Sequence, residues 1–288
     1  MGKDRAAFHG VRSARPPRRG RVALAVAGGC LGAVFLIAVL APALPTPAPV
    51  PTRPETGSYP RVKGVPKPVA PAFTVPDPDP LPAGEHRTAW APVSRPVRAR
   101  LLPDADSAEV ARLSPRTPEG TSNIVVALRR RTDPAGELWV EVMLPVLPNG
   151  TTGWVPRDAL GGYGSVQTEL VVDLSELEAT LFRAGRAVFS AKVGVGAPAW
   201  PTPTGRFYVR NKLLGFDDPF YGPVAFGTSA RSAVLTDWPA GGFVGIHGTN
   251  RPELLPGRVS HGCIRLRNAD ILELSRLMPV GSPLVIRA

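Results

Sequence analysis

The chain has 288 residues, of which 35 are proline and 30 are glycine, and it carries a formal net charge of +11. This length allows one large or two modest domains, and the proline and glycine content predicts folded parts joined by a segment that does not fold. Seven basic residues and one acidic residue precede the first apolar run, and they account for most of the net charge. The rest of the chain is only mildly basic, which argues against a nucleic-acid partner.

An apolar run without charged residues spans residues 22–41, behind the basic tail over residues 1–21. Its length is about the 20 residues needed to cross a bilayer, and basic residues ahead of such a run remain in the cytoplasm. The pattern predicts a single-pass anchor in the cell membrane, with everything after Ala41 outside the cytoplasm. The alternative is a signal peptide cleaved near Ala41-Pro42-Ala43, which would leave the protein secreted.

The chain has two cysteines, and Cys30 lies inside the apolar run. Cys263 is therefore the single cysteine of the exported portion and has no partner for an internal disulfide. A lone cysteine outside the cytoplasm is buried and inert, paired between chains, or a reactive thiol. Its neighbours in the sequence decide between these alternatives, as described below.

Residues 42–87 are rich in proline, with runs such as Pro45-Thr46-Pro47 and Asp77-Pro78-Asp79-Pro80. Proline removes hydrogen-bond donors and fixes φ, so this segment cannot build a helix or a sheet. We predict an extended, disordered linker of about 3.1 Å per residue. Such a spacer would hold the folded part away from the membrane.

Short apolar stretches alternate with turn signals over residues 88–160. Strands are predicted over residues 97–101, 124–128 and 138–142, with turns at Asp133-Pro134-Ala135-Gly136 and Pro148-Asn149-Gly150. With its closing Gly153-Trp154-Val155-Pro156, this segment resembles a bacterial SH3-like small barrel. The resemblance implies either cell-wall binding or a structural spacer domain.

From Thr168 to Ala288 the pattern predicts a mainly β domain with one or two short helices. Strands are expected over residues 170–174, 206–209, 233–236 and 243–246, with a hairpin formed by 179–183 and 186–189. A helix is expected to begin at Asn268 as its N-cap, to carry Ile271 and Leu274 on one face, and to end at Pro279.

Both histidines of the folded part lie close to the exported cysteine. His247 follows Gly245-Ile246, and the run Ser260-His261-Gly262-Cys263 comes after a polar loop. A histidine can take the proton of a cysteine thiol and activate it as a nucleophile. Backbone amides beside the cysteine can stabilise the oxyanion of an acyl-transfer reaction, and Gly262 allows substrate to approach closely.

At these residues the chain resembles the L,D-transpeptidase family, also called YkuD domains. The family signature is a histidine, a spacer, and then Ser/Thr-His-Gly-Cys, here His247 and Ser260-His261-Gly262-Cys263. The turn Thr202-Pro203-Thr204-Gly205 is a further shared feature. The resemblance covers residues 168–288 and implies a β-sandwich catalytic domain preceded by the SH3-like domain and the membrane anchor.

The resemblance implies a peptidoglycan L,D-transpeptidase that needs no cofactor or metal. By this resemblance, Cys263 is expected to attack a donor stem peptide and form a thioester, which an amine of an acceptor stem resolves into a cross-link. His247 is the base, oriented by the carbonyl of Gly248, and the amides at His261, Gly262 and Cys263 form the oxyanion hole. Ser260 supports the loop. Inactivation by carbapenems is also implied.

Arg265 departs from the asparagine that many family members carry two residues after the cysteine. Its guanidinium could bind a stem carboxylate or could be a solvated loop charge. Tyr221 and Trp238 either line the cleft or belong to the core, and we do not include them in the predicted site.

Three alternatives remain at the level of the sequence. His247, His261 and Cys263 are zinc ligands by type, although no further ligand completes the set. The chain could instead be a non-catalytic wall-binding protein. Finally, water in place of the acceptor amine would give an L,D-carboxypeptidase acting on the same stems, and a wall-linked protein could also be the acceptor.

Overall fold

The computed structural model describes residues 80–215, 218–235 and 242–288. By its contacts the chain divides into residues 1–70 and residues 71–288, and every described residue lies in the second unit. The predicted anchor over residues 22–41 and most of the linker lie outside the described residues. Within the described ranges, no helix is long and apolar enough to span a membrane.

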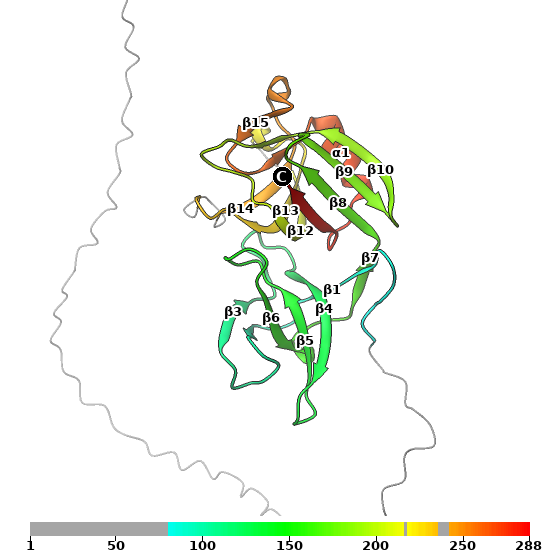
Figure 1. The fold of residues 1–288 in the computed structure, drawn as a ribbon, viewed down its shortest axis with the longest axis vertical. Coiled ribbons are helices and arrows are strands. Elements are labelled where there is room, and N and C mark those ends of the chain that lie inside the picture. The colour runs from blue at the N-terminus through cyan, green and yellow to red at the C-terminus, as the bar shows by residue number, and fades with distance from the viewer. Residues whose placement is uncertain (1–79, 216–217, 236–241) are drawn as a thin grey trace, which may run out of the picture. The chain divides into compact units, whose positions relative to one another are not determined.

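A seven-stranded antiparallel sheet contains the first described strands (Figure 1). Its order is β3 (Glu109–Leu113), β2 (Val97–Arg100), β6 (Thr152–Pro156), β5 (Leu138–Met143), β4 (Ile124–Thr132), β1 (Thr88–Pro92) and β7 (Gly164–Val166). Burial alternates along β1 and β2, so one face is covered by apolar packing, with Ala91, Ala99 and Val140 fully buried. The three strands predicted in this segment all form.

The second sheet has ten strands (Figure 1). Its order is β10 (Arg186–Lys192), β9 (Glu178–Arg183), β8 (Thr168–Asp173), β17 (Pro283–Arg287), β12 (Gly205–Leu214), β13 (Val224–Arg231), β14 (Phe243–His247), β16 (Ile264–Arg265), β11 (Gly194–Gly196) and β15 (Gly257–Ser260). The predicted mainly β fold with few helices is confirmed.

Strand β12 belongs to both halves of this sheet. Its first residues, Gly205 to Tyr208, pair with β17, and its later residues, Val209 to Leu214, pair with β13. Side chains from both halves, including Leu170, Leu181, Phe226 and Ile246, share one buried apolar core. Strands β14 and β16 lie next to β13 in the order of the sheet. This core therefore supports the strands on or beside which the predicted catalytic residues lie.

The one α-helix of the described residues, α1 (Asn268–Leu277), packs on this core through Ile271 and Leu274, as predicted. Its start differs from the prediction. Arg267 is the N-cap and Asn268 is the first helical residue. The Asn268 Oδ1 atom instead accepts a hydrogen bond from Thr249 N, at 2.9 Å. A tertiary contact has therefore replaced the local cap.

The strand predicted over residues 233–236 is wrong where the structure describes it. Strand β13 ends at Arg231, and the next residues turn. The hydroxyl of Ser232 accepts hydrogen bonds from the amides of Val234 and Leu235. Side-chain capping of the backbone in this way competes with strand pairing.

Candidate active site

Strand β14 and the loop between β15 and β16 bring the predicted catalytic residues together. β14 and β16 run in parallel, with Ile246 opposite Ile264. His247 at the end of β14 and Cys263 just before β16 therefore open into one cleft. Phe220, Tyr221, Phe243, His261 and Arg265 are among the other residues that line this cleft.

The imidazole of His247 is held in one tautomer. Its Nδ1 atom lies 2.6 Å from the carbonyl oxygen of Gly248. Because a carbonyl can only accept, Nδ1 carries the proton and Nε2 keeps a free lone pair. His247 is 2% exposed, and this burial lowers its pKa to about 4. The ring is therefore a neutral base at physiological pH, oriented by the contact that the family resemblance implies.

Cys263 is a free, partly exposed cysteine. Burial raises the pKa of its thiol, while the Gly245 amide, which donates to Sγ at 3.3 Å, and the charge of Arg265 act in the opposite direction. A Cβ atom built on Gly245 would lie 3.8 Å from both Cys263 Sγ and His247 Cδ2. The missing side chain at this position therefore leaves space open beside both the thiol and the imidazole.

Hydrogen bonds inside the loop fix the backbone around the cysteine. Ser260 Oγ donates to the Cys263 carbonyl at 2.6 Å and accepts from the Gly262 amide at 3.1 Å. Ser260 is 1% exposed, so its hydroxyl acts within the loop and is not presented to the cleft. Gly262 has a φ of 107°, a conformation that favours glycine.

Thr202 supports the same loop from a distant segment. Its buried hydroxyl donates to the Gly262 carbonyl at 2.9 Å and accepts from the Gly196 amide at 2.8 Å. A single side chain thus joins β11 to the residue before the thiol. In the sequence, this threonine was noted only as part of a turn that resembles one of the L,D-transpeptidase family. In the structure, its hydroxyl positions the backbone next to Cys263.

Replacing Thr202 by valine should loosen the nucleophile loop. Valine keeps the shape of the side chain but leaves the Gly262 carbonyl and the Gly196 amide without this partner. We expect the free energy of unfolding to fall by about 1–3 kcal/mol, together with a slower alkylation of Cys263. Denaturant titration and alkylation rates would measure both effects. Thr202→Ser, which keeps the hydroxyl, is the matched control, and equal behaviour of the two variants would contradict this role.

Aromatic rings form much of the cleft surface. The Tyr221 and His247 rings form a T-shaped contact with centroids 5.1 Å apart, and the centroid of the Phe220 ring lies 5.9 Å from that of His247. The ring of His261, itself exposed, packs on Trp200 at 4.3 Å. Tyr221 therefore lines the cleft, while Trp238 lies outside the described residues.

Arg265 is a buried cation beside the thiol. It is 7% exposed, and its guanidinium lies 4.5 Å from the centre of the Phe220 ring. Among the described residues no carboxylate forms an ion pair with it, and its Nε atom has no hydrogen-bond partner. A buried guanidinium without a carboxylate is suited to receive one from a ligand.

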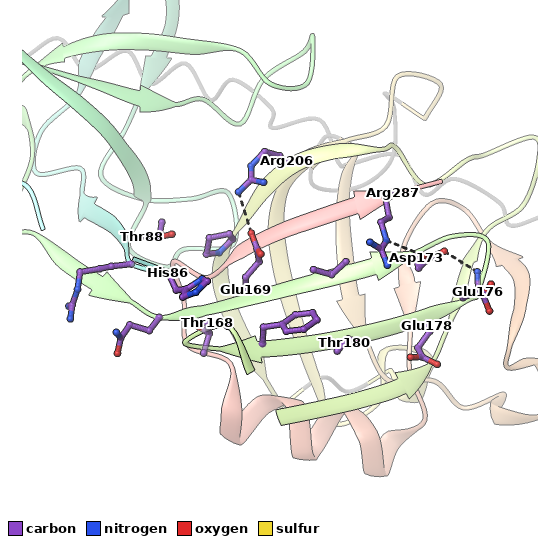
Figure 2. Close-up of a pocket in the computed structure, with 16 residues that line it drawn as sticks. His86, Thr88, Thr168, Glu169, Asp173, Glu176, Glu178, Thr180, Arg206 and Arg287 are labelled. Atoms are coloured by element: carbon purple, nitrogen blue, oxygen red, sulfur yellow. Dashed lines mark hydrogen bonds and ion pairs between the residues drawn. The ribbon is translucent and has the colours of Figure 1, made fainter. Parts of the chain in front are cut away.

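A separate cavity of about 590 Å³ lies over β8 and β9 (Figure 2). Its lining contains no cysteine and neither His247 nor His261. Two of its cations are already paired, Arg206 with Glu169 at 3.2 Å and Arg287 with Asp173 at 3.0 Å. The cleft around Cys263, and not this cavity, holds the groups suited to acyl transfer.

The zinc hypothesis can be compared with the geometry. Across residues 80–215, 218–235 and 242–288, no three histidine, cysteine, aspartate or glutamate side chains are placed to hold a metal ion together. The Nδ1 atom of His247 is also committed to a backbone carbonyl. The arrangement matches a thiol and its base.

The fold and the site thus define a mainly β domain with a thiol and a neutral imidazole in one cleft. A sequence model of the L,D-transpeptidase (YkuD) catalytic domain matches residues 167–286. The putative L,D-transpeptidase YkuD of Bacillus subtilis is 30% identical over 122 residues, which cover 42% of this chain and 67% of that protein. The chain belongs to the L,D-transpeptidase (YkuD) family.

Other relatives match over shorter shares of their length. The probable L,D-transpeptidase YbiS of Escherichia coli is 36% identical over 85 residues, which cover 30% of this chain and 26% of that protein. The solved catalytic domain of the Enterococcus faecium L,D-transpeptidase is 28% identical, with a TM-score of 0.32, over 42% of this chain and 96% of that one. The matched segment therefore spans about a quarter to two thirds of the curated relatives named here.

Proposed function

We propose that the chain is a peptidoglycan L,D-transpeptidase that cross-links stem peptides through a thioester on Cys263. One observation carries the proposal: the thiol opens into the same cleft as a histidine whose Nδ1 proton is fixed on the Gly248 carbonyl. That hydrogen bond leaves Nε2 as the proton acceptor. Membership of the L,D-transpeptidase family supports peptidoglycan as the substrate, and we assign its peptide stems as donor and acceptor.

The proposed reaction has two acyl transfers. His247 takes the thiol proton as Cys263 attacks the carbonyl before the terminal D-residue of the donor stem, and that proton then leaves with the departing amine. An acceptor amine next attacks the thioester, loses a proton to His247, and forms the new amide. The proton returns to the cysteine thiolate, so the enzyme ends as it began.

Backbone amides of the nucleophile loop are the proposed oxyanion donors. The Gly262 amide already donates to Ser260 Oγ. We therefore assign it to holding the loop, and assign oxyanion binding to the amides of His261 and Cys263. The exposed His261 ring lines the cleft beside these amides and packs on Trp200.

Product analysis tests the proposal directly. The purified chain is incubated with a disaccharide tetrapeptide stem, and products are identified by mass spectrometry. We expect release of the terminal D-residue together with a cross-linked dimer. Release without a dimer would identify an L,D-carboxypeptidase, and no release by the folded protein would favour a non-catalytic wall-binding role.

Arg265 is the proposed site for a stem carboxylate, because it is buried, lines the cleft and lacks a carboxylate partner among the described residues. Arg265→Met should raise KM for the donor stem about tenfold or more, through loss of a charge-assisted contact. Arg265→Lys, which keeps the charge without the planar fork, should give an intermediate KM. An unchanged KM in the methionine variant would show that Arg265 does not bind the stem and has a structural role.

We also propose that residues 22–41 anchor the chain in the cell membrane and that residues 42–87 form a spacer. Residues 88–160 are then the SH3-like domain and residues 168–288 the catalytic domain, both facing the cell wall. Support comes from the uncharged apolar run, the basic tail and the wall substrate of the family. Alkaline extraction of membranes distinguishes a retained anchor from a cleaved signal peptide. An anchored chain stays with the membrane, and a cleaved chain is released.

A further inference from the structure

Phe243 forms part of the wall of the catalytic cleft and is held by two arginines. It is the first residue of β14 and lines the cleft with His247 and Cys263. The guanidinium carbons of Arg210 and Arg231 lie 3.9 Å and 4.8 Å from the centre of its ring. Such cations attract the face of an aromatic ring, so the position of Phe243 depends on where these two side chains are held.

The charge of Arg210 is balanced from outside the catalytic domain. Arg210 is 2% exposed, and its Nη2 atom lies 3.0 Å from the Glu119 carboxylate, which comes from the segment between β3 and β4. Among the described residues, Glu119 is the one carboxylate in an ion pair with Arg210. A buried cation is strongly disfavoured without its partner, so this pair fixes both side chains.

Asn211 holds the same carboxylate from a second direction. Its Nδ2 atom donates to Glu119 Oε2 at 3.2 Å and to Thr121 Oγ1 at 3.1 Å. Its Oδ1 atom accepts from the Gly227 amide on β13, at 3.0 Å. Asn211 is 3% exposed, so the contact between the two segments is buried and polar.

Arg231 is held by a different residue of the first sheet region. Asn149 donates through Nδ2 to the Arg231 carbonyl at 2.8 Å, and its Oδ1 accepts from the Arg231 amide at 3.0 Å. This two-point contact pins the last residue of β13. Residues of the predicted SH3-like domain thus hold Arg210 by its side chain and Arg231 by its backbone, through separate contacts.

We propose that the segment 88–160 completes the catalytic cleft, with Glu119 and Asn149 as positioning residues that fix Phe243 through Arg210 and Arg231. The inference rests on the proposed function, since it assigns Phe243 to contact with the donor stem. The loop around Cys263 is held by Ser260 and Thr202, in a separate set of hydrogen bonds. Loss of Glu119 should therefore weaken stem binding and leave the thiol unaffected.

Glu119→Gln in the full chain tests this arrangement. We expect KM for the donor stem to rise about tenfold, with kcat within about twofold and an unchanged alkylation rate of Cys263. The matched control is Glu141→Gln, which removes another carboxylate that pairs with an arginine, Arg129, of the same sheet region. The effect of Glu119→Gln should also be non-additive with Arg210→Met, because both break one pair.

A second readout needs no substrate. Labelling with 4-fluorophenylalanine places a fluorine on each of the ten phenylalanines of the chain. The signal that disappears in a Phe243→Leu variant is that of Phe243. That signal should shift in Glu119→Gln and in Asn149→Ala, and should stay in place in Glu141→Gln. Glu119→Asp, which keeps the charge, replaces the glutamine variant if the latter does not fold.

The outcomes separate this inference from the proposed function. Wild-type protein without turnover would count against the transpeptidase, while the fluorine signal would still test the positioning of Phe243. Turnover with the same KM in Glu119→Gln and Glu141→Gln, and an unmoved Phe243 signal, would overturn the inference and leave the transpeptidase in place.

Discussion

Replacing Cys263 by serine is expected to lower stem turnover by about a thousandfold or more, since no other thiol lies in the described part of the chain. A serine hydroxyl is a far weaker nucleophile beside the same neutral histidine, whose geometry it leaves intact. Carbapenem acylation should disappear in the same variant. Intact-mass spectrometry after incubation with a carbapenem would show one adduct on the wild type and none on Cys263→Ser.

The control for this experiment is the stability of the variant. Ser260 and Thr202 bond to backbone atoms of the loop and not to the thiol, so Cys263→Ser should unfold at nearly the wild-type denaturant concentration. An adduct that persists on the folded serine variant would show that another residue is acylated. The nucleophile assignment would then be wrong.

Replacing His247 by glutamine should lower turnover by about a hundred- to ten-thousandfold, the usual contribution of a positioned general base. The pKa of the Cys263 thiol is raised, so little of it is present as thiolate at neutral pH without a base. His247 is therefore needed to remove the proton. In the variant, alkylation of Cys263 should rise about tenfold per pH unit, following the thiolate fraction toward the raised pKa. Alkylation is measured on the Cys263 peptide by mass spectrometry.

The activity of the wild-type enzyme should fall only at acid pH, where His247 becomes protonated. Burial lowers the pKa of His247 to about 4, so the imidazole stays neutral and able to accept a proton from about pH 5 upward. The acid limb of kcat/KM should lie near pH 4, well below the usual histidine range. The resting enzyme should show no thiolate absorbance at neutral pH, and an NMR titration of the His247 ring with a midpoint near 6.5 would contradict this account.

The grouping of Cys263 with His247 in one cleft could be predicted, because the residues of this candidate site are nearly contiguous in the chain. Ser260 through Cys263 are consecutive, and His247 comes shortly before them, so type and spacing were enough to propose a thiol and its base. The contact of His247 with Gly248 is between adjacent residues and came with the family resemblance. The mainly β fold followed in the same way from short alternating apolar stretches.

The supporting residues could not be predicted, because long-range pairing brings them in. Thr202 reaches Gly262 across 60 residues, and Glu119 reaches Arg210 across 91. Neither contact leaves a local pattern. Local rules also failed where a tertiary partner competed for the same atom. Asn268 has the right type for a helix cap, yet its Oδ1 atom accepts from Thr249.

The pairing of β8 with β17 bears on how the protein is made. Leu170 lies opposite Leu284 in this parallel pair, 114 positions later in the chain. During synthesis, β8 leaves the ribosome long before the strand that will be its neighbour, and the catalytic core cannot close until that strand arrives. The thiol site rests on this core, so it can form only after nearly the whole of residues 168–288 has been synthesised.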